Sequence, residues 1–97
     1  MKLFKSKNLF EAMDYVKAGG QALHVWKPPE NAYSEAPVCF KKTKLWGHLL
    51  DNNLARLTAT ARNLGVKVIK VSKQGQRGQH IDLCGKPLQK AIGEAEK

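Results

Sequence analysis

Long hydrophobic runs, acidic residues and cysteine motifs are scarce in this chain of 97 residues. No apolar run approaches the roughly 18 residues that a membrane-spanning helix needs, so we expect no membrane span. The basic start of the chain leads into no apolar stretch, so we also expect no secretory signal. Acidic residues number eight against 17 lysines and arginines, which leaves a formal net charge of +9. With 42% hydrophobic residues the chain can still bury a core, which excludes a wholly disordered basic tail.

The two cysteines, Cys39 and Cys84, are far apart in the sequence and form no CxxC motif. We therefore predict two reduced thiols in a cytoplasmic protein, not a disulfide framework. No phosphate-binding loop of the Walker type is present either. The glycine-bearing loop Gly75–Gly78 lacks both the GxGxxG and the GxxxxGK pattern, and we predict no cofactor.

Three segments carry apolar residues at the 3.6-residue spacing of an amphipathic helix. The first is expected from Asn8 to Ala18, because the two glycines that follow are typical of a helix end. The second has an apolar stripe that we expect to be buried against a sheet, formed by Leu54, Leu57, Ala61 and Leu64. The third begins near Pro87, since proline is favoured at the first position of a helix.

Four other segments are typical of strands, because they are β-branched or aromatic, or alternate between polar and apolar residues. They are Ala22–Trp26, a stretch within Lys44–Leu50, Val66–Ser72 and His80–Cys84. Residues 28–37 contain three prolines and are expected to form an exposed loop. Residues 1–97 are therefore predicted to be a single α/β domain with the order α-β-β-α-β-β-α. We expect helices to cover a three- or four-stranded sheet, and the central helix allows a parallel crossover.

Two histidines and one aspartate are the candidate catalytic residues. His80 and Asp82 are two residues apart on an expected strand, so their side chains share one face. His48 lies near the end of an earlier strand, just before the central helix. If these strands are neighbours, the three side chains converge into a set suited to acid–base catalysis or to a divalent metal ion. A His-x-Asp pair on a strand face is, however, usually a solvated or hydrogen-bonded polar pair, and the sequence alone assigns none of the three residues as a metal ligand.

Basic residues are the broader signal. Between Asn53 and Gly93, eight lysines and arginines stand against one acidic residue. Such a charge favours a polyanionic partner, and nucleic acid is the commonest one inside cells. The residues to which we assign nucleic-acid binding are Lys41, Lys42, Lys44, Lys67, Lys70, Lys73 and Arg77. If these residues neutralise about five phosphates of duplex DNA, the log–log dependence of affinity on salt has a slope of about −4 to −5.

Three short motifs stand out between residues 45 and 93. They are Trp46-Gly47-His48-Leu49, the helix end Ala61-Arg62-Asn63-Leu64-Gly65, and Gly78-Gln79-His80-Ile81-Asp82-Leu83. Together they resemble a small bacterial and phage family of unknown function, which shows W-x-H-L, a helix ending in Leu-Gly, and a G-x-H-Y-D-like strand. Ile81 departs from that pattern, since the family tends to have an aromatic residue there, and the aspartate-bearing N-terminal strand of the family is not evident. The resemblance implies no established activity, but it singles out His48, His80 and Asp82 a second time.

These observations predict a small basic protein, of phage or mobile-element origin, that binds nucleic acid or another polyanion through a Lys/Arg-rich face. One alternative is a small hydrolase or phosphodiesterase-like enzyme that uses His48, His80 and Asp82. Another is an accessory protein that binds an acidic protein surface. Binding requires the lysines to lie on one face, catalysis requires the histidines to converge, and a protein partner requires an exposed apolar patch.

Overall fold

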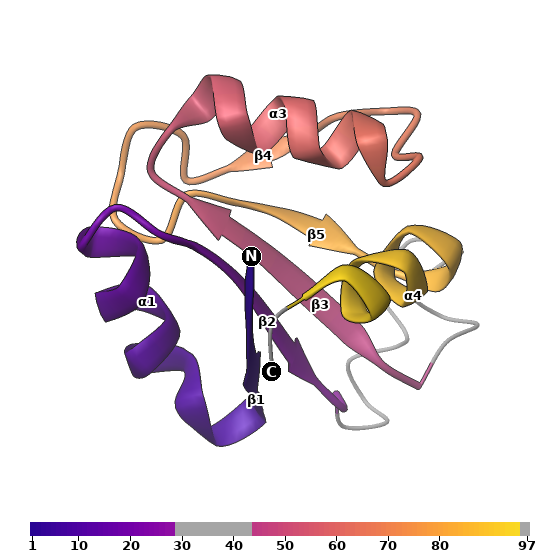
Figure 1. The fold of residues 1–97 in the computed structure, drawn as a ribbon, viewed down its shortest axis with the longest axis horizontal. Helices are drawn as coiled ribbons and strands as arrows, with labels where there is room; N and C mark the ends of the chain where they lie inside the picture. Colours follow the sequence, from indigo (N-terminus) through magenta and orange to yellow (C-terminus); the bar gives the residue numbers. More distant parts are fainter. Residues whose placement is uncertain (29–43, 96–97) are drawn as a thin grey trace.

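The computed structural model of this protein describes residues 1–28 and 44–95. Within these ranges the chain forms the elements drawn in Figure 1. In order they are β1 (Lys2–Lys5), the 3-10 turn η1 (Ser6–Asn8), α1 (Leu9–Lys17), β2 (Gln21–Trp26), β3 (Trp46–Asp51), α3 (Leu54–Asn63), β4 (Val71–Ser72), β5 (His80–Leu83) and α4 (Gly85–Glu94). No helix of the described ranges has the length and apolar character that crossing a membrane requires. Most of the loop expected at 28–37 lies outside the described residues.

The described strands form one mixed sheet of five strands in the order β1-β2-β3-β5-β4. β1 and β2 pair in parallel, whereas β2–β3, β3–β5 and β5–β4 pair antiparallel. The α/β class is confirmed, but the sheet has five strands where three or four were expected. The parallel crossover is made by α1 and not by the central helix α3, which leads through edge strand β4 to β5. The chain therefore passes from β3 through α3 and β4 before it reaches β5, and β5 pairs antiparallel with both β3 and β4.

Two differences in the strands have physical causes. Lys2–Lys5 is short and basic, so its sequence gives little indication of a strand, yet its Phe4 is buried between the sheet and α1. The opposite error concerns Val66–Ser72, of which only Val71 and Ser72 form a strand. The residues before Val71 lie outside the sheet, and Val68 among them is exposed. β-Branched residues favour a strand, but they form one only where a neighbouring strand pairs with them.

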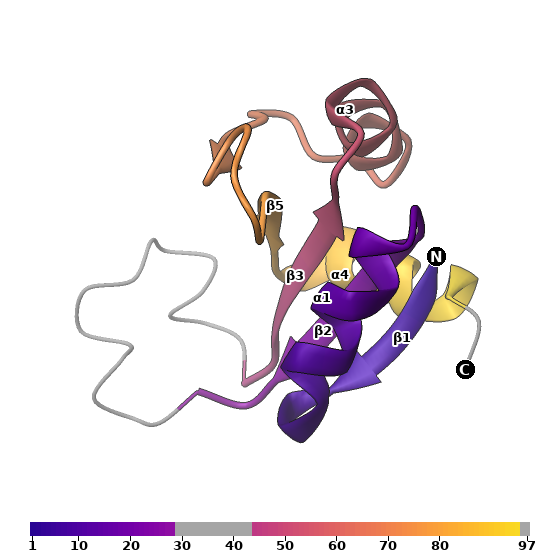
Figure 2. The same ribbon diagram turned by 90° about the vertical axis from the view of Figure 1, so that its left-hand side faces the viewer.

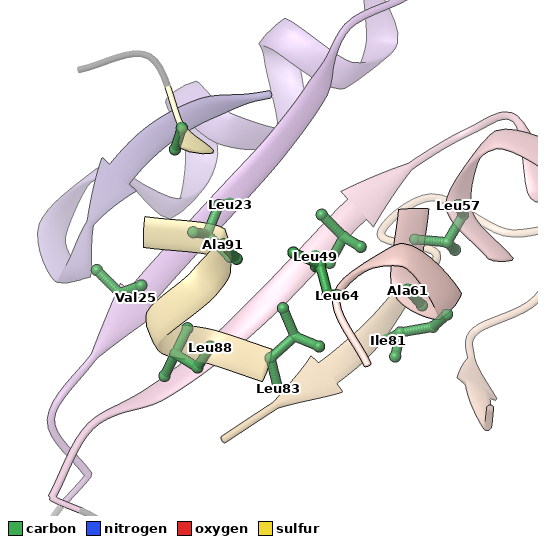
Figure 3. Close-up of a cluster of buried hydrophobic side chains, with 11 residues drawn as sticks. Leu23, Val25, Leu49, Leu57, Ala61, Leu64, Ile81, Leu83, Leu88 and Ala91 are labelled. Carbon is green, nitrogen blue, oxygen red and sulfur yellow. The ribbon is translucent and has the colours of Figure 1, made fainter. Parts of the chain in front are cut away.

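The two faces of the sheet are packed differently, as Figures 1 and 2 show from two directions. On one face, α3 and α4 cover the main core, drawn in Figure 3. That core contains Leu23, Val25, Leu49, Leu57, Ala61, Leu64, Ile81, Leu83, Leu88, Ala91 and Ala95. On the other face, α1 packs through Ala12 and Val16 onto Phe4, Ala22 and Leu50. This smaller cluster involves β1, β2 and one end of β3, and it includes no residue of β5.

The predicted apolar stripe of the central helix is correct at three of its four positions. Leu57, Ala61 and Leu64 are buried, but the side chain of Leu54 is 37% exposed. Leu54 is the first residue of α3, directly after the N-cap Asn53, and this turn lies beside the end of β3. The main core also explains Gly47, because a Cβ there would lie 2.5 Å from Cδ1 of Leu88. Glycine at this position therefore lets α4 approach the sheet closely.

A buried carboxylate fastens α3 to the sheet. Asp51, at the end of β3, is 0% exposed and accepts two hydrogen bonds from Arg56, with Nε at 2.6 Å and Nη2 at 2.7 Å. Gln21 Nε2 and the backbone N–H of Asn53 also donate to this carboxylate, at 3.0 and 2.9 Å. The hydrogen bond with Asp51 is the main cause that raises the pKa of Arg56. The corner between β3 and α3 is thus held by a fully paired ion.

The prediction of a reduced thiol is wrong for Cys84. This residue is 8% exposed, stands at the N-cap of α4 and is disulfide-bonded. The other predicted thiol, Cys39, lies outside the described residues. Because disulfides persist mainly in oxidising compartments, the cytoplasmic location loses one of the observations that favoured it.

Candidate functional site

One face of the sheet carries a row of aromatic and titratable side chains from three adjacent strands. The sheet register pairs His24 with His48, and His48 in turn with Asp82. Directly opposed residues share a face, and so do residues two apart on one strand. We call this set the histidine face, and it comprises His24 and Trp26 on β2, Trp46 and His48 on β3, and His80 and Asp82 on β5.

Three of these side chains meet at one carboxylate oxygen. Nε2 of His48 and Nε2 of His80 each lie 3.3 Å from Oδ1 of Asp82. The two imidazole centroids are 4.3 Å apart. The structure thus brings together the three candidate catalytic residues, although through an antiparallel strand pair and not through a parallel crossover. The side chain of Asp82 is 45% exposed and those of His48 and His80 are 24% and 13% exposed, so solvent reaches the cluster from the carboxylate side.

The orientation of the His80 ring is set by the turn before β5. Its Nδ1 lies 2.7 Å from the carbonyl oxygen of Gly78, and because a carbonyl only accepts, Nδ1 carries the proton and donates. Gly78 has a φ of +86°, a conformation that favours glycine. The buried side chain of Gln79 holds the turn, donating to the carbonyl of Asp51 at 2.8 Å and accepting from the N–H of Gly75 at 2.8 Å. Nε2 of His80 is consequently aimed at Asp82.

Aromatic rings continue the row toward the other side of the sheet. The ring centroid of Trp26 lies 4.0 Å from that of His48 and 6.1 Å from that of Trp46. His24 is stacked beside both Trp26 and His48, with centroid separations of 5.5 and 5.8 Å. Its Nε2 lies 3.3 Å from the carbonyl oxygen of Ser6, while its buried Nδ1 has no hydrogen-bond partner among residues 1–28 and 44–95. The rings of Trp46, Trp26, His48 and His80 therefore form a continuous surface across β2, β3 and β5.

His24 and Trp26 belong to this surface but were not among the predicted site residues. Their spacing of two residues on an expected strand did place them on one face. The pairing of that strand with Trp46–Leu50 cannot be read from one sequence, because 19 residues (27–45) separate them and their sequence has no Asn-Gly or Asp-Gly pair that would indicate a tight hairpin. Only the register shows that His24 lies opposite His48.

The pKa values of the three clustered groups diverge. Burial is the main cause that lowers the pKa of His48 to about 4, and the positive charge of His80 adds to it. Burial is also the largest influence on His80, but the hydrogen bonds to Asp82 and Gly78 and the charge of Asp82 together outweigh it and raise the pKa. Burial opposes ionisation of Asp82 as well, yet its hydrogen bond with His80 and the charges of both imidazoles lower its pKa.

This divergence predicts two separate imidazole titrations. At about pH 6 in a chelator-treated sample, we expect His48 to be neutral and His80 to be protonated, because their pKa values lie on opposite sides of the ordinary value of about 6.5. Long-range ¹H–¹⁵N NMR of the ring nitrogens distinguishes the two forms directly. Superimposable titration curves for the two rings would contradict this assignment.

The basic residues proposed for nucleic-acid binding occupy different places. Lys73 follows β4, and its Nζ lies 4.0 Å from the position that a Cβ on Gly78 would take, next to the carbonyl that holds the His80 ring. Its positive charge opposes protonation of both His48 and His80. Arg77 is exposed in the loop between β4 and β5, with Nη2 4.0 Å from Oδ1 of Asp14. Of the other predicted residues, Lys44 is exposed just before β3, Lys67 and Lys70 are exposed between α3 and β4, and Lys41 and Lys42 lie outside the described residues.

A cavity of about 410 Å³ lies next to the cluster of His48, His80 and Asp82, between α1 and the loop that connects β4 to β5. Its polar lining includes Lys17 of α1, Asn52 at the end of β3, and Arg77. Gly78, whose carbonyl holds the His80 ring, also lines it. The cavity therefore extends the histidine face along the β4–β5 loop and adds two cationic side chains to its border.

No family model, curated protein or solved structure matches this chain. The short motifs within residues 45–93 consequently remain a resemblance, and a function must be argued from the geometry of the histidine face.

Proposed function

We propose that the histidine face binds single-stranded nucleic acid. The observation that carries the proposal is the row of rings from Trp46 through Trp26 to His48 on the face of the sheet that carries α1. Aromatic rings stack on any base, and this stacking is available only where bases are unpaired, so the surface favours a single strand over a duplex. Sequence preference is expected to be weak for the same reason.

Cationic side chains at the border of this surface supply contacts for the phosphates. Lys73 lies against Gly78, whose carbonyl holds the His80 ring, and Arg77 and Lys17 line the adjoining cavity. Lys44 is exposed two residues before Trp46, at the other end of the row. A strand whose bases stack on the rings therefore meets positive charge at both ends, which supports binding through both stacking and phosphate neutralisation.

Salt-dependent binding of a fluorescently labelled single-stranded oligonucleotide tests this proposal. Lys73→Ala should weaken binding and reduce the log–log salt slope by about 0.7, the contribution of one neutralised phosphate on a single strand. Lys86→Ala is the matched control, because Lys86 is an exposed lysine on α4, which packs on the opposite face of the sheet. Both tryptophans lie on the histidine face, so their intrinsic fluorescence should change on binding.

Three results would refute binding at this surface. An affinity for the oligonucleotide that is the same at low and high salt would show that no phosphates are neutralised. Equal losses from Lys73→Ala and Lys86→Ala would show that only the overall charge matters. A preference for duplex over single strand would exclude stacking on Trp26.

A second candidate function, hydrolysis of a phosphodiester bond, is favoured by the convergence of His48, His80 and Asp82 on one oxygen. In such a reaction the oxygen of water bonds to phosphorus as water loses a proton, and the bond from phosphorus to the leaving oxygen breaks as that oxygen gains one. The test is cleavage of a fluorogenic oligonucleotide by the wild-type chain and by Asp82→Asn. Cleavage that survives this substitution unchanged would exclude the cluster as the active site.

A further inference from the structure

We propose that His48, His80 and Asp82 bind a zinc ion and leave its fourth coordination position open to solvent. The inference needs no nucleic acid, so it stands or falls separately from the function proposed above. It also assigns a role that the sequence alone did not, since three scattered residues become one ligand set only through the β3–β5 register.

The spacing of the ligand atoms fits a tetrahedral ion. Both Nε2 atoms are 3.3 Å from Oδ1 of Asp82, and the ligand atoms of all three residues lie within 4.8 Å of one another. The two 3.3 Å separations match a tetrahedral ion, and the two imidazoles close on the ion by a small side-chain shift. Two ligands bound to zinc at about 2.0–2.1 Å with tetrahedral angles are about 3.3 Å apart, whereas octahedral angles bring them to about 2.9 Å. The hydrogen bond between His80 and Asp82 is longer than the usual length of about 2.7–2.9 Å for a charge-assisted bond, so a zinc ion can replace its proton with little change in the separation.

The second hydrogen bond of His80 prepares it as a ligand. Nδ1 donates to the carbonyl of Gly78, so the neutral ring presents the lone pair of Nε2 to the same point that Asp82 faces. Histidines that bind metal ions characteristically donate their other ring N–H to a carbonyl or carboxylate. Once Nε2 loses its proton, it and Oδ1 are two acceptors 3.3 Å apart, and a cation that binds both takes the place of that proton.

The chemistry of the donor atoms selects the ion. Two imidazole nitrogens and one carboxylate oxygen favour zinc and similar transition metal ions over magnesium and calcium, which prefer oxygen ligands. His24 is not part of the set, because its Nε2 faces the carbonyl of Ser6 and its ring is 5.8 Å from that of His48. Three protein ligands with a solvent-accessible side are typical of a catalytic zinc site, in which water occupies the fourth position.

Isothermal titration of the untagged, metal-stripped chain with zinc chloride is the direct test. We expect a single zinc ion per chain, no measurable heat from magnesium at the same concentration, and competition between zinc and cobalt. Bound cobalt should show the strong visible absorption of a four-coordinate ion. Absence of stoichiometric zinc binding, or binding of magnesium with equal affinity, would overturn the proposal.

Matched aspartate substitutions locate the site. Asp82→Asn keeps the shape of a half-exposed side chain and should weaken zinc binding more than about tenfold, since loss of even an outer-shell partner costs that much. Asp14→Asn, at an exposed aspartate of α1, should leave zinc affinity unchanged. His48→Ala should weaken zinc binding at least as much as Asp82→Asn, and circular dichroism establishes whether that variant is folded. Equal zinc affinities for the wild type and Asp82→Asn would place the ion elsewhere and refute the assignment.

Discussion

Arg56→Ala should lower the free energy of unfolding by about 3–5 kcal/mol, the cost of leaving a buried charge without its partner. Asp51 is 0% exposed, and Arg56 supplies the only cationic partner among the hydrogen bonds that this carboxylate accepts within the described residues. After the substitution, Gln21 and the N–H of Asn53 remain as donors, but neither neutralises the carboxylate. Urea denaturation followed by circular dichroism measures the change.

Arg62→Ala is the control for this prediction, because Arg62 is exposed in the last turn of the same helix. Its loss should change stability by no more than about 0.5 kcal/mol, as expected for a surface position. Arg56→Lys should recover only part of the stability, since an ammonium group cannot make the paired bonds of Nε and Nη2. Equal stabilities for Arg56→Ala and Arg62→Ala would show that the ion pair does not hold this corner.

Leu57→Ala should cost about 2–5 kcal/mol, the range for removing a large aliphatic side chain from a packed core. Leu57 is fully buried in the main core, where α3 packs on the sheet. Leu54→Ala provides the comparison within one helix, because the exposed Leu54 side chain loses few contacts and should cost well under half as much. A Leu57→Ala variant as stable as Leu54→Ala would mean that the central helix is not anchored through this stripe.

The elements with strong periodicity could be predicted from the sequence. The stripe of Leu57, Ala61 and Leu64 and the alternation at His80–Leu83 are local patterns that burial confirms. β1 could not be predicted in the same way, because four residues with two lysines become a strand only through parallel pairing with β2. The short β4 shows the converse, since a strongly β-branched segment remains mostly unpaired.

The candidate site was predictable residue by residue but not as a geometry. The W-x-H-L and H-x-D motifs marked His48, His80 and Asp82, while the distances among them depend on strand pairing between segments 34 residues apart, as His48 pairs with Asp82. The same dependence on pairing hid Trp26 and His24, whose neighbours come from β3. Long-range register is set by the competition among all strands for partners, and a single sequence does not reveal its outcome.

Because His48 lies on β3 and His80 and Asp82 lie on β5, binding of a metal ion by these three residues is coupled to folding. The ligand atoms come from two strands that meet only in the native sheet, so a bound ion has no equivalent site on an unfolded chain. Such an ion stabilises the folded state in proportion to the logarithm of its free concentration, by about 2.7 kcal/mol at one hundred times its dissociation constant. The melting temperature of this chain should therefore rise with zinc concentration. The dependence of the melting temperature on zinc would therefore report whether β3 and β5 are paired.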